Sequence, residues 1–401
     1  MNNKVKLTQD EVNDVWSAEW NKEDVTTKEI FTQRLFVEGY PVFKKYIPKD
    51  TKQLLDVGAG TGRYGLKFAQ DFPDAHVTIT DILDESVALI SGFVKDLNTK
   101  NVTVAKEDVF HLSFAEGTFD VVFCDVVIQH IPQYQNAVKE MIRVLKPGGT
   151  LILSSVNSWN LPHALYKQGL ALLGKKYSYG HEKTFSAGEL RTLLQRYHMK
   201  VIATDGFYFA YGVFRWKIHH PIFKLVGRAI NRVTKFFDLI GGRAVSRLFG
   251  FEVFAVGKKF ALRVKYSGIV QMPSVEDNAL GTLMMGEGTK SIPFEIKRVY
   301  FIKDIPDFYA VRGGHAHKTL DQVIFCINGS FQLRIDDGTT YQKIRLTASG
   351  FGIRLGPNLW HSMREFSKDC VILVVASGYH DESDYIRDHE QFLEYLKQHS
   401  A

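Results

Sequence analysis

Two groups of residues in this sequence have the types and spacing of ligand sites. The first surrounds a glycine-rich loop, Gly58-Ala-Gly-Thr-Gly62, and Asp56 precedes that loop by two residues. Asp81 and Asp108 stand where later apolar runs end. Glycines let the backbone approach a ligand and present N–H groups at a helix start. An acid placed like Asp81 can accept hydrogen bonds from both ribose hydroxyls, and one placed like Asp108 can hold an adenine amine. The group predicts a nucleoside-cofactor site.

The second group is a histidine pair in the run RGGHAHKTLDQVIFCING. His315 and His317 are two residues apart, so both face the same side of a strand. Arg298 and Tyr300 share a face in IKRVYFI for the same reason. If both faces point inward, they form a polar pocket of imidazoles, a phenol and a guanidinium. An imidazole has a pKa suited to moving a proton beside a ketone. The alternative for each residue is a hydrogen-bonded side chain in the core.

The spacing of this run also resembles the first motif of metal-binding cupins, but one position departs from it. That motif normally has Glu at the position of Gln322. A neutral amide is a poorer ligand for a divalent cation, although His361 in GPNLWHSM offers a further imidazole. We therefore predict no metal at this site.

Two parts of the chain have different residue patterns, and each part is expected to form a domain that positions one of these groups. Helical segments alternate with apolar runs over 53–57, 75–81, 101–105, 119–124 and 150–154. This alternation predicts an α/β domain with a doubly wound parallel sheet. After about residue 265, short β-rich runs with intervening turns predict an all-β barrel or sandwich. We expect a first domain over 1–262 and a second over 263–401.

The composition of the chain limits the classes of protein to which it could belong. The chain has 401 residues, 45% hydrophobic and 23% charged, as in ordinary globular proteins. Its net charge of +6 is mild and does not call for nucleic acid. Cys124, Cys326 and Cys370 form no CxxC pair, which favours a reducing compartment over a disulfide framework. The start has no apolar signal region and no run of about 18 apolar residues occurs, so we expect a cytoplasmic protein.

The glycine-rich loop resembles that of class I S-adenosylmethionine-dependent methyltransferases. GxGxG with a preceding acid favours this family over nicotinamide enzymes, which have GxGxxG. The resemblance covers roughly residues 40–260 and includes FDVVFCDVVIQHI and RVLKPGGTLIL. It implies S-adenosylmethionine as cofactor. The residues it implies around the cofactor are Asp56, Gly58, Gly60 and Gly62 at the methionine side, Asp81 and Ile82 at the ribose, and Asp108 and Val109 at the adenine.

The methyl acceptor is expected near Asp125 and His130, which follow the fourth predicted strand. Either could act as a base toward a hydroxyl or amine. The alternative is that both residues cap a helix or pack.

The second domain resembles cupin-type, jelly-roll sugar 3,4-ketoisomerases that act on dTDP-4-keto-6-deoxyglucose. The resemblance covers about residues 290–397 and includes VRGGHAHKTLDQVIFCINGS and ASGYHDESDYIRDHEQFLEYL. It implies that His315 is the proton-shuttling base, that Tyr300 supports it, and that Arg312 and His317 complete the pocket. The further substrate contacts expected are Arg298, Arg312, His361 and Tyr379.

The two resemblances together predict a bifunctional enzyme of nucleotide-sugar biosynthesis. Its partners would be a dTDP-linked 4-keto-6-deoxy sugar and thymidine diphosphate, and its methyl acceptor a sugar hydroxyl or amine. We expect a homodimer through the cupin domain. The alternative is an active methyltransferase with a non-catalytic, sugar-binding or dimerising cupin, because the arginine expected in an early turn of the family is missing from Asp277-Asn-Ala-Leu-Gly281.

One basic segment belongs to neither site. Residues 207–250 contain eight Lys or Arg and the single acid Asp238, with many aromatic residues. We expect an insert that covers the acceptor site and attracts an anionic acceptor, or a solvated cover of the sheet. A membrane surface is the less favoured partner, because Pro221, Gly227 and the pair Gly241-Gly242 should interrupt a long helix.

Overall fold

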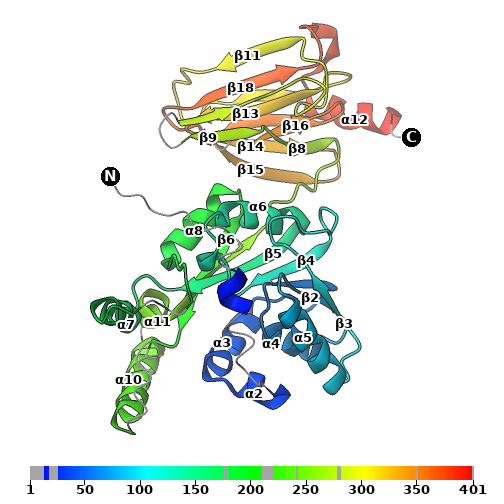
Figure 1. The fold of residues 1–401 in the computed structure, drawn as a ribbon. Coiled ribbons are helices and arrows are strands. Elements are labelled where there is room, and N and C mark those ends of the chain that lie inside the picture. Colours follow the sequence, from blue (N-terminus) through cyan, green and yellow to red (C-terminus); the bar gives the residue numbers. More distant parts are fainter. Residues whose placement is uncertain are drawn as a thin grey trace. The chain divides into compact units, whose positions relative to one another are not determined.

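A computed structural model describes residues 13–17, 26–175, 177, 179–209, 221–240, 243–277, 281–348 and 351–399 (Figure 1). The chain divides into two compact units, Met1–Phe260 and Ala261–Ala401. The division falls two residues before the boundary expected from the sequence.

The first unit is built on a seven-stranded sheet of order β3-β2-β1-β4-β5-β7-β6. The strands are β1 (Gln53–Val57), β2 (His76–Asp81), β3 (Val102–Lys106), β4 (Phe119–Cys124), β5 (Leu145–Val156), β6 (Lys200–Phe207) and β7 (Glu252–Lys258). Strands β1 to β5 are parallel, whereas β7 runs antiparallel to both β5 and β6. The doubly wound α/β fold is therefore confirmed.

Helices cover both faces of this sheet. They are α2 (Thr27–Thr32), α3 (Arg34–Lys44), α4 (Arg63–Asp71), α5 (Asp84–Asp96), α6 (Tyr134–Val144), α7 (Leu161–Leu172), α8 (Ala187–Arg196), α10 (Pro221–Ile240) and α11 (Ala244–Phe249). Because both faces are covered, the central strands β1 and β4 are buried at nearly every residue rather than at alternate ones. Val122 of β4 packs in one core cluster with residues of α6 and α8, and its neighbour Phe123 packs in the other with residues of α3, α4 and α5.

The spacing of Val12, Trp16 and Trp20 predicts an amphipathic helix within residues 1–50. A helical segment does cover 13–17 and includes Trp16. Val12 and Trp20 lie outside the described residues.

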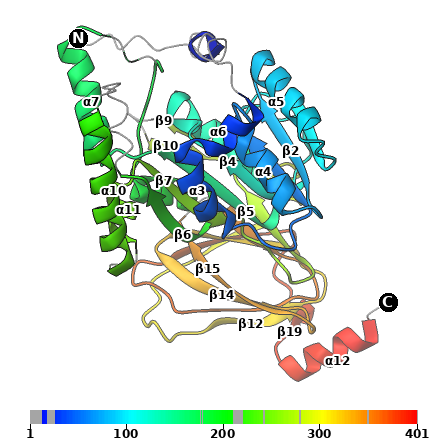
Figure 2. The same ribbon diagram turned by 90° about the horizontal axis from the view of Figure 1, so that it is seen from below.

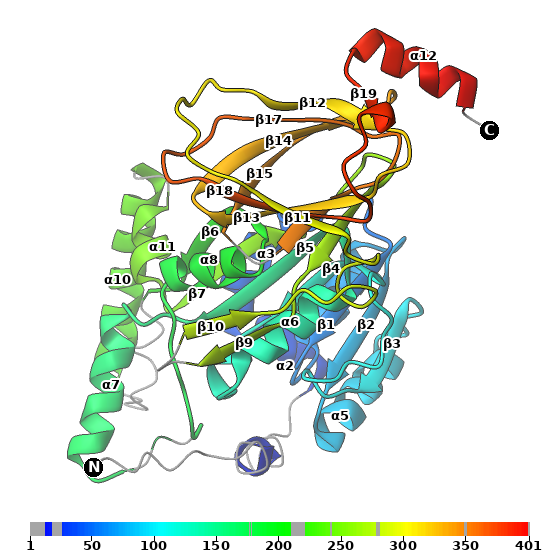
Figure 3. The ribbon, with the colours of Figure 1, turned by 90° about the horizontal axis from the view of Figure 1, so that it is seen from above.

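The second unit consists of two five-stranded antiparallel sheets, visible in Figure 3. One has the order β11-β18-β13-β16-β8 and the other β15-β14-β17-β12-β19. The strands of this unit are β8 (Ser267–Gln271), β9 (Ser274–Asp277), β10 (Gly281–Met284), β11 (Arg298–Ile302), β12 (Arg312–His317), β13 (Gln322–Asn328), β14 (Ser330–Asp336), β15 (Tyr341–Thr347), β16 (Phe351–Leu355), β17 (Trp360–Arg364), β18 (Val371–Ala376) and β19 (Tyr385–Ile386). Strands β9 and β10 pair as a separate hairpin.

Alternation along the strands builds the core of this unit. Phe331, Leu333 and Ile335 of β14 are buried, while the residues between them are partly exposed. A short 3-10 turn, Glu382–Asp384, leads through β19 to the terminal helix α12 (His389–His399). The all-β fold predicted for this part of the chain is confirmed.

Candidate active sites

The first unit contains a cavity of about 230 Å³ at the carboxyl ends of β1, β2 and β4. Its wall is formed by the glycine loop, by the acids that end the strands and by the residues after them. The sequence-predicted residues that line it are Asp56, Gly58, Gly60, Asp81, Ile82, Asp108, Val109, Asp125 and His130. The fold thus brings both candidate acceptor residues and all predicted cofactor residues except Gly62 to one cavity; Gly62 belongs to the same loop but does not line the cavity.

The loop between β1 and α4 needs its glycines. Gly58, Gly60 and Gly62 have φ values of 65°, 58° and 69°, which residues with a side chain rarely adopt. A Cβ on Gly58 would also lie 2.6 Å from Cγ2 of Val127. The close approach leaves the loop backbone as the cavity wall, which suits a ligand held by main-chain N–H groups.

Asp81, the last residue of β2, holds the loop. Its Oδ2 accepts from the backbone N–H of Gly60 at 2.8 Å, and its Oδ1 accepts from that of Leu83 at 3.1 Å. Burial raises the pKa of Asp81, and the bond from Gly60 opposes that rise. Each carboxylate oxygen has a second lone pair, so the group can still accept from ligand hydroxyls.

Asp56 is fully buried beneath the loop. Its Oδ2 accepts from the backbone N–H of Gly65 at 2.9 Å. Burial, and next the charge of Asp125, raise the pKa of Asp56 to about 8. This pKa favours the protonated form of Asp56 at pH 7, which its residue type alone does not indicate.

Asp108 follows β3 and its side chain is partly open. Its Oδ1 accepts from the N–H of Phe110 at 2.9 Å, and its Oδ2 lies 3.6 Å from Nδ1 of His111. This loop cap fixes the carboxylate at the cavity wall.

At the far side of the cavity, Asp125 belongs to a buried acidic pair that the sequence does not reveal. Glu252, the first residue of β7, is 0% exposed. Burial, and then the neighbouring Asp125, raise the pKa of Glu252 well above its ordinary value. Asp125 also accepts from Oγ of Ser154 at 2.7 Å and lies 3.9 Å from Nη2 of Arg63.

The backbone is strained next to this pair. Val126 has φ of 56°, a conformation that is costly for a β-branched residue. Its N–H donates to Oγ of Ser154 at 3.0 Å. Ser154 therefore ties both Asp125 and the strained residue to β5, which holds the carboxylate at the cavity.

His130 lines the cavity, but other groups engage its ring. Its Nδ1 lies 2.8 Å from the carbonyl oxygen of His181, so Nδ1 carries the proton. Nε2 then accepts from the side-chain amide of Gln129 at 3.2 Å. The ring also meets the Trp16 ring edge-on, with centroids 4.8 Å apart. These contacts suit a wall of the cavity better than a free base.

The second unit holds a cluster of three imidazoles and a phenol. His315 and His317 of β12 face the same side, with ring centroids 4.9 Å apart. The register places His361 of β17 opposite His315, with centroids 4.6 Å apart. Tyr385 of β19 pairs with His317, and its ring lies 4.8 Å from His315 and 4.4 Å from His317. Tyr385 was not predicted, although it stands in the segment that carries the ketoisomerase resemblance.

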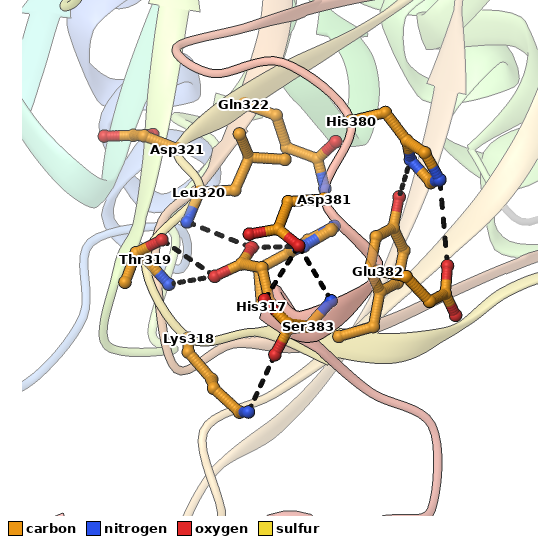
Figure 4. A network of polar contacts seen from close by, with 12 residues as sticks. His317, Lys318, Thr319, Leu320, Asp321, Gln322, His380, Asp381, Glu382 and Ser383 are labelled. Carbon is orange, nitrogen blue, oxygen red and sulfur yellow. Dashed lines mark hydrogen bonds and ion pairs between the residues drawn. The ribbon is translucent and has the colours of Figure 1, made fainter.

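A loop from the end of the chain orients His317. Its Nδ1 lies 2.9 Å from Oδ2 of Asp384. Figure 4 shows the network of polar contacts around His317. Asp384 also accepts from the N–H and the hydroxyl of Thr319, at 2.7 and 2.8 Å. Burial lowers the pKa of His317, and the bond to Asp384 opposes that change.

Tyr300 and Gln322 approach the cluster from the other sheet. The Tyr300 hydroxyl donates to Oε1 of Gln322 at 3.2 Å, and the Gln322 amide nitrogen lies 3.5 Å from Nε2 of His361. Burial raises the pKa of Tyr300 to about 12. The position where a metal-binding cupin has a carboxylate is thus occupied by an amide that bridges a phenol and an imidazole. In the described part of the chain, no three His, Cys, Asp or Glu side chains are grouped to hold a metal ion.

His315 is a neutral imidazole in this setting. Burial, and then the neighbouring His317 and Arg387, lower the pKa of His315 to about 4. This pKa lies below the ordinary value of an imidazole, because a largely buried ring near the guanidinium of Arg387 resists a second proton. A neutral imidazole at physiological pH is available to accept a proton.

The remaining residues predicted to contact the sugar substrate differ in how deeply they are buried. The Arg298 guanidinium lies over the Tyr300 ring at 5.4 Å, and its buried Nε has no hydrogen-bond partner. Arg312 is exposed at the start of β12, and Tyr379 is 77% exposed. In the turn where an arginine was expected, residues 278–280 lie outside the described ranges.

Comparisons with known proteins match both units. Residues 265–397 match a family model described as WxcM-like, C-terminal, and residues 48–201 match one described as a methyltransferase domain. A TDP-4-oxo-6-deoxy-α-D-glucose-3,4-oxoisomerase of Aneurinibacillus thermoaerophilus is 48% identical over 116 residues, which are 29% of this chain and 83% of that protein. A variant of the 3,4-ketoisomerase QdtA of Thermoanaerobacterium thermosaccharolyticum, solved with TDP-4-keto-6-deoxyglucose, is 36% identical over 34% of this chain and 97% of that one, with a TM-score of 0.33.

The methyltransferase relatives are more distant. A demethylmenaquinone methyltransferase of Listeria welshimeri is 27% identical over 137 residues, 32% of this chain and 58% of that protein. The chain thus spans little more than half the length of these relatives.

Fold, sites and comparisons define a methyltransferase domain joined to a cupin domain. Through residues 265–397, the chain belongs to the family of sugar 3,4-ketoisomerases. Both resemblances seen in the sequence are confirmed.

Proposed function

We propose that the second unit converts a TDP-4-keto-6-deoxyhexose into its 3-keto isomer. The observation that carries this proposal is the cluster of His315, His317, His361 and Tyr385, in a unit of which 116 residues are 48% identical to an enzyme named for this reaction. Imidazoles with one fixed tautomer suit proton transfer between adjacent carbons.

In this mechanism His315 is the base. Its neutral imidazole takes the proton from C3, which the C4 carbonyl acidifies, and the electron pair forms the C3–C4 double bond of an enediolate. Imidazolium His315 then returns a proton to C4, while the O3 proton passes to O4. His317 borders the base, and Tyr300 lies in the facing sheet, where its hydroxyl donates to Gln322; we assign both residues to proton transfer between these oxygens. Atoms and charge balance without an external oxidant or reductant.

Arg298 is the better placed of the two candidate arginines. Its Nε is buried and has an open donor, whereas Arg312 is exposed. A guanidinium with unmet donors suits a developing oxyanion or a diphosphate oxygen. We assign Arg298 to the pocket and Arg312 to its rim.

We further infer that the first unit transfers a methyl group from S-adenosylmethionine to a sugar hydroxyl or amine. The left-handed glycines, the loop-bound Asp81 and the cavity beside them fit a nucleoside cofactor. When bound, this cofactor supplies an electrophilic methyl group. The chain's own residues position the acceptor and exclude water, and Asp125 is the candidate base.

We propose a homodimer formed through the second unit. Strand β11 is at the edge of its sheet, and Val299 and Phe301 on its outer face are 53% and 62% exposed. An open edge strand with an apolar face favours pairing with another copy. Light scattering of a Phe301→Ser variant tests this: the variant should be monomeric at concentrations where the natural chain is dimeric.

The isomerase proposal is tested by incubating the full chain with TDP-4-keto-6-deoxyglucose in deuterated water. NMR should show deuterium entering the ring as a 3-keto sugar forms. Binding of the sugar without exchange would instead support the non-catalytic cupin.

A further inference from the structure

The basic segment of the first unit forms a helix that the sequence does not predict. Helix α10 is continuous from Pro221 to Ile240, so the expectation that Gly227 interrupts it is wrong. Pro221 stands at the first helical position, where a missing N–H breaks no helical bond. Gly227 lowers helix propensity without ending the helix.

Helix α10 faces the rest of the unit with one apolar and one acidic residue. Ile230 packs against the core of the unit, and Asp238 is buried. The Asp238 carboxylate accepts from the backbone N–H of Ser246 at 2.9 Å and from the Ser246 hydroxyl. These contacts fix how α10 is rotated about its axis.

The outward face carries an apolar stripe. Three- and four-residue spacing places these side chains on one side of the helix. They are Leu225 at 68%, Val233 at 54%, Phe236 at 59%, Phe237 at 53% and Ile240 at 70% exposed. A helix that only covered a sheet would bury such residues, so this stripe is available to an apolar partner.

Exposed apolar residues also occur on the neighbouring helices α7 and α11. Figures 1 and 2 show α10 next to α11, and in Figure 2 α7 extends beyond the end of α10; the rings of Trp159, just before α7, and Phe249 of α11 meet with centroids 6.4 Å apart. Further exposed apolar residues here are Trp159 at 57%, Leu161 at 61%, Leu165 at 46%, Leu172 at 89%, Leu173 at 72% and Phe249 at 41%. We use the term apolar platform for the exposed apolar residues named above, which belong to α7, α10, α11 and the turns that flank α7.

Cations border the platform. Arg228 and Arg232 are exposed and one helical turn apart, next to the stripe, and Arg247 of α11 is also exposed. Among residues 221–240 and 243–249, the only acid is Asp238, whose carboxylate is buried. The surface is therefore apolar at its centre and positive at its edge.

We propose that the apolar platform docks on the surface of an anionic lipid bilayer. An amphipathic helix with Phe and Leu on one side and arginines beside them lies in the plane of such an interface. Anionic headgroups complement the arginines, while the acyl region takes the exposed apolar side chains. No helix in the described ranges is long and apolar enough to cross a membrane.

A second copy of this surface is a poorer occupant. A two-fold interface brings identical patches together, so Arg228 and Arg232 of each copy would face cations with no exposed acid on α10 or α11 to offset them. Like charges across an interface oppose association.

The test is sedimentation of the full chain with vesicles of phosphatidylcholine alone or with about 30% phosphatidylglycerol. The natural chain should pellet with the anionic vesicles, and less so as salt rises. Arg228→Glu/Arg232→Glu should lower the partition coefficient at least about 25-fold, since each basic residue contributes about fivefold. Phe236→Ser/Phe237→Ser should also lose binding.

Matched controls separate the platform from general surface effects. Arg191→Glu/Arg196→Glu reverses two exposed arginines on α8, and Phe308→Ser/Tyr309→Ser removes an exposed aromatic pair in the second unit. Both should pellet like the natural chain. All variants should keep the natural melting temperature within a few degrees, which shows that they fold.

Two results would overturn the proposal. One is equal pelleting of the Arg228/Arg232 variant and its α8 control. The other is no pelleting of the natural chain at low salt, with self-association that the Phe236/Phe237 variant abolishes; the platform would then be a protein interface.

Discussion

Nδ1 of His317 donates to Oδ2 of Asp384 over 2.9 Å, and this bond fixes the proton on Nδ1. Nε2 is therefore left as the acceptor, on the ring edge away from the carboxylate. One loop near the end of the chain therefore orients a ring that lies against His315 and Tyr385.

Replacement of Asp384 should impair the isomerase through His317. Asp384→Ala removes the partner that opposes the burial-driven fall in the His317 pKa, so that pKa should fall further. We expect kcat to drop roughly 10–100-fold, as for other lost orienting partners, with an altered acid limb of the pH–rate profile. Asp381→Asn, which changes an exposed carboxylate nearby, should leave the profile unaltered. An unchanged profile in Asp384→Ala would show that the bond is only structural.

His315→Asn should abolish exchange of the substrate proton with deuterated water. An amide of similar size cannot accept the C3 proton, so the loss should be at least about 10³-fold, while binding of thymidine diphosphate persists. The natural chain should keep its activity in EDTA because Gln322 replaces the usual carboxylate ligand. Activity lost in EDTA and restored by a divalent metal would contradict a metal-independent site.

Asp81→Ala should weaken binding of S-adenosylmethionine. The variant loses ribose hydrogen bonds worth roughly 1–3 kcal/mol in total and frees the N–H of Gly60 from the carboxylate. Titration calorimetry measures the change. Asp84→Ala is the matched control, since Asp84 is 77% exposed and pairs with Lys106; equal affinity in both variants would reject the ribose assignment.

Cofactor binding should be linked to a proton on Asp56. Its pKa of about 8 means that the unliganded chain holds this proton at pH 7. A bound cationic cofactor would favour the carboxylate and lower that pKa, so binding should release up to one proton. Affinity should rise with pH up to about 8 and then level.

Calorimetry in buffers of different ionisation enthalpy counts the released protons. In Asp56→Asn the release should vanish. If the natural chain releases no proton at pH 7, Asp56 is either already ionised or remains neutral in the complex.

Several features of this protein could be predicted from the sequence because they depend on residues close together in the chain. The glycine loop after Asp56 is one, since left-handed backbone at three positions in five restricts the residue type locally. The shared face of His315 and His317 is another, because strand geometry alone sets it. The order of strands and helices and the change to an all-β second unit follow from local periodicity in the same way.

The tertiary structure decided the rest, because the contacts involved join distant segments. Nothing near Glu252 in the chain indicates that it pairs with Asp125, and only the antiparallel insertion of β7 beside β5 brings them together. Tyr385 reaches the histidines through the pairing of β19 with β12. The rotation of α10 is set by Asp238 and Ile230. A hydrophobic pattern shows that a helix has an apolar side, but packing determines whether that side faces the core or the solvent.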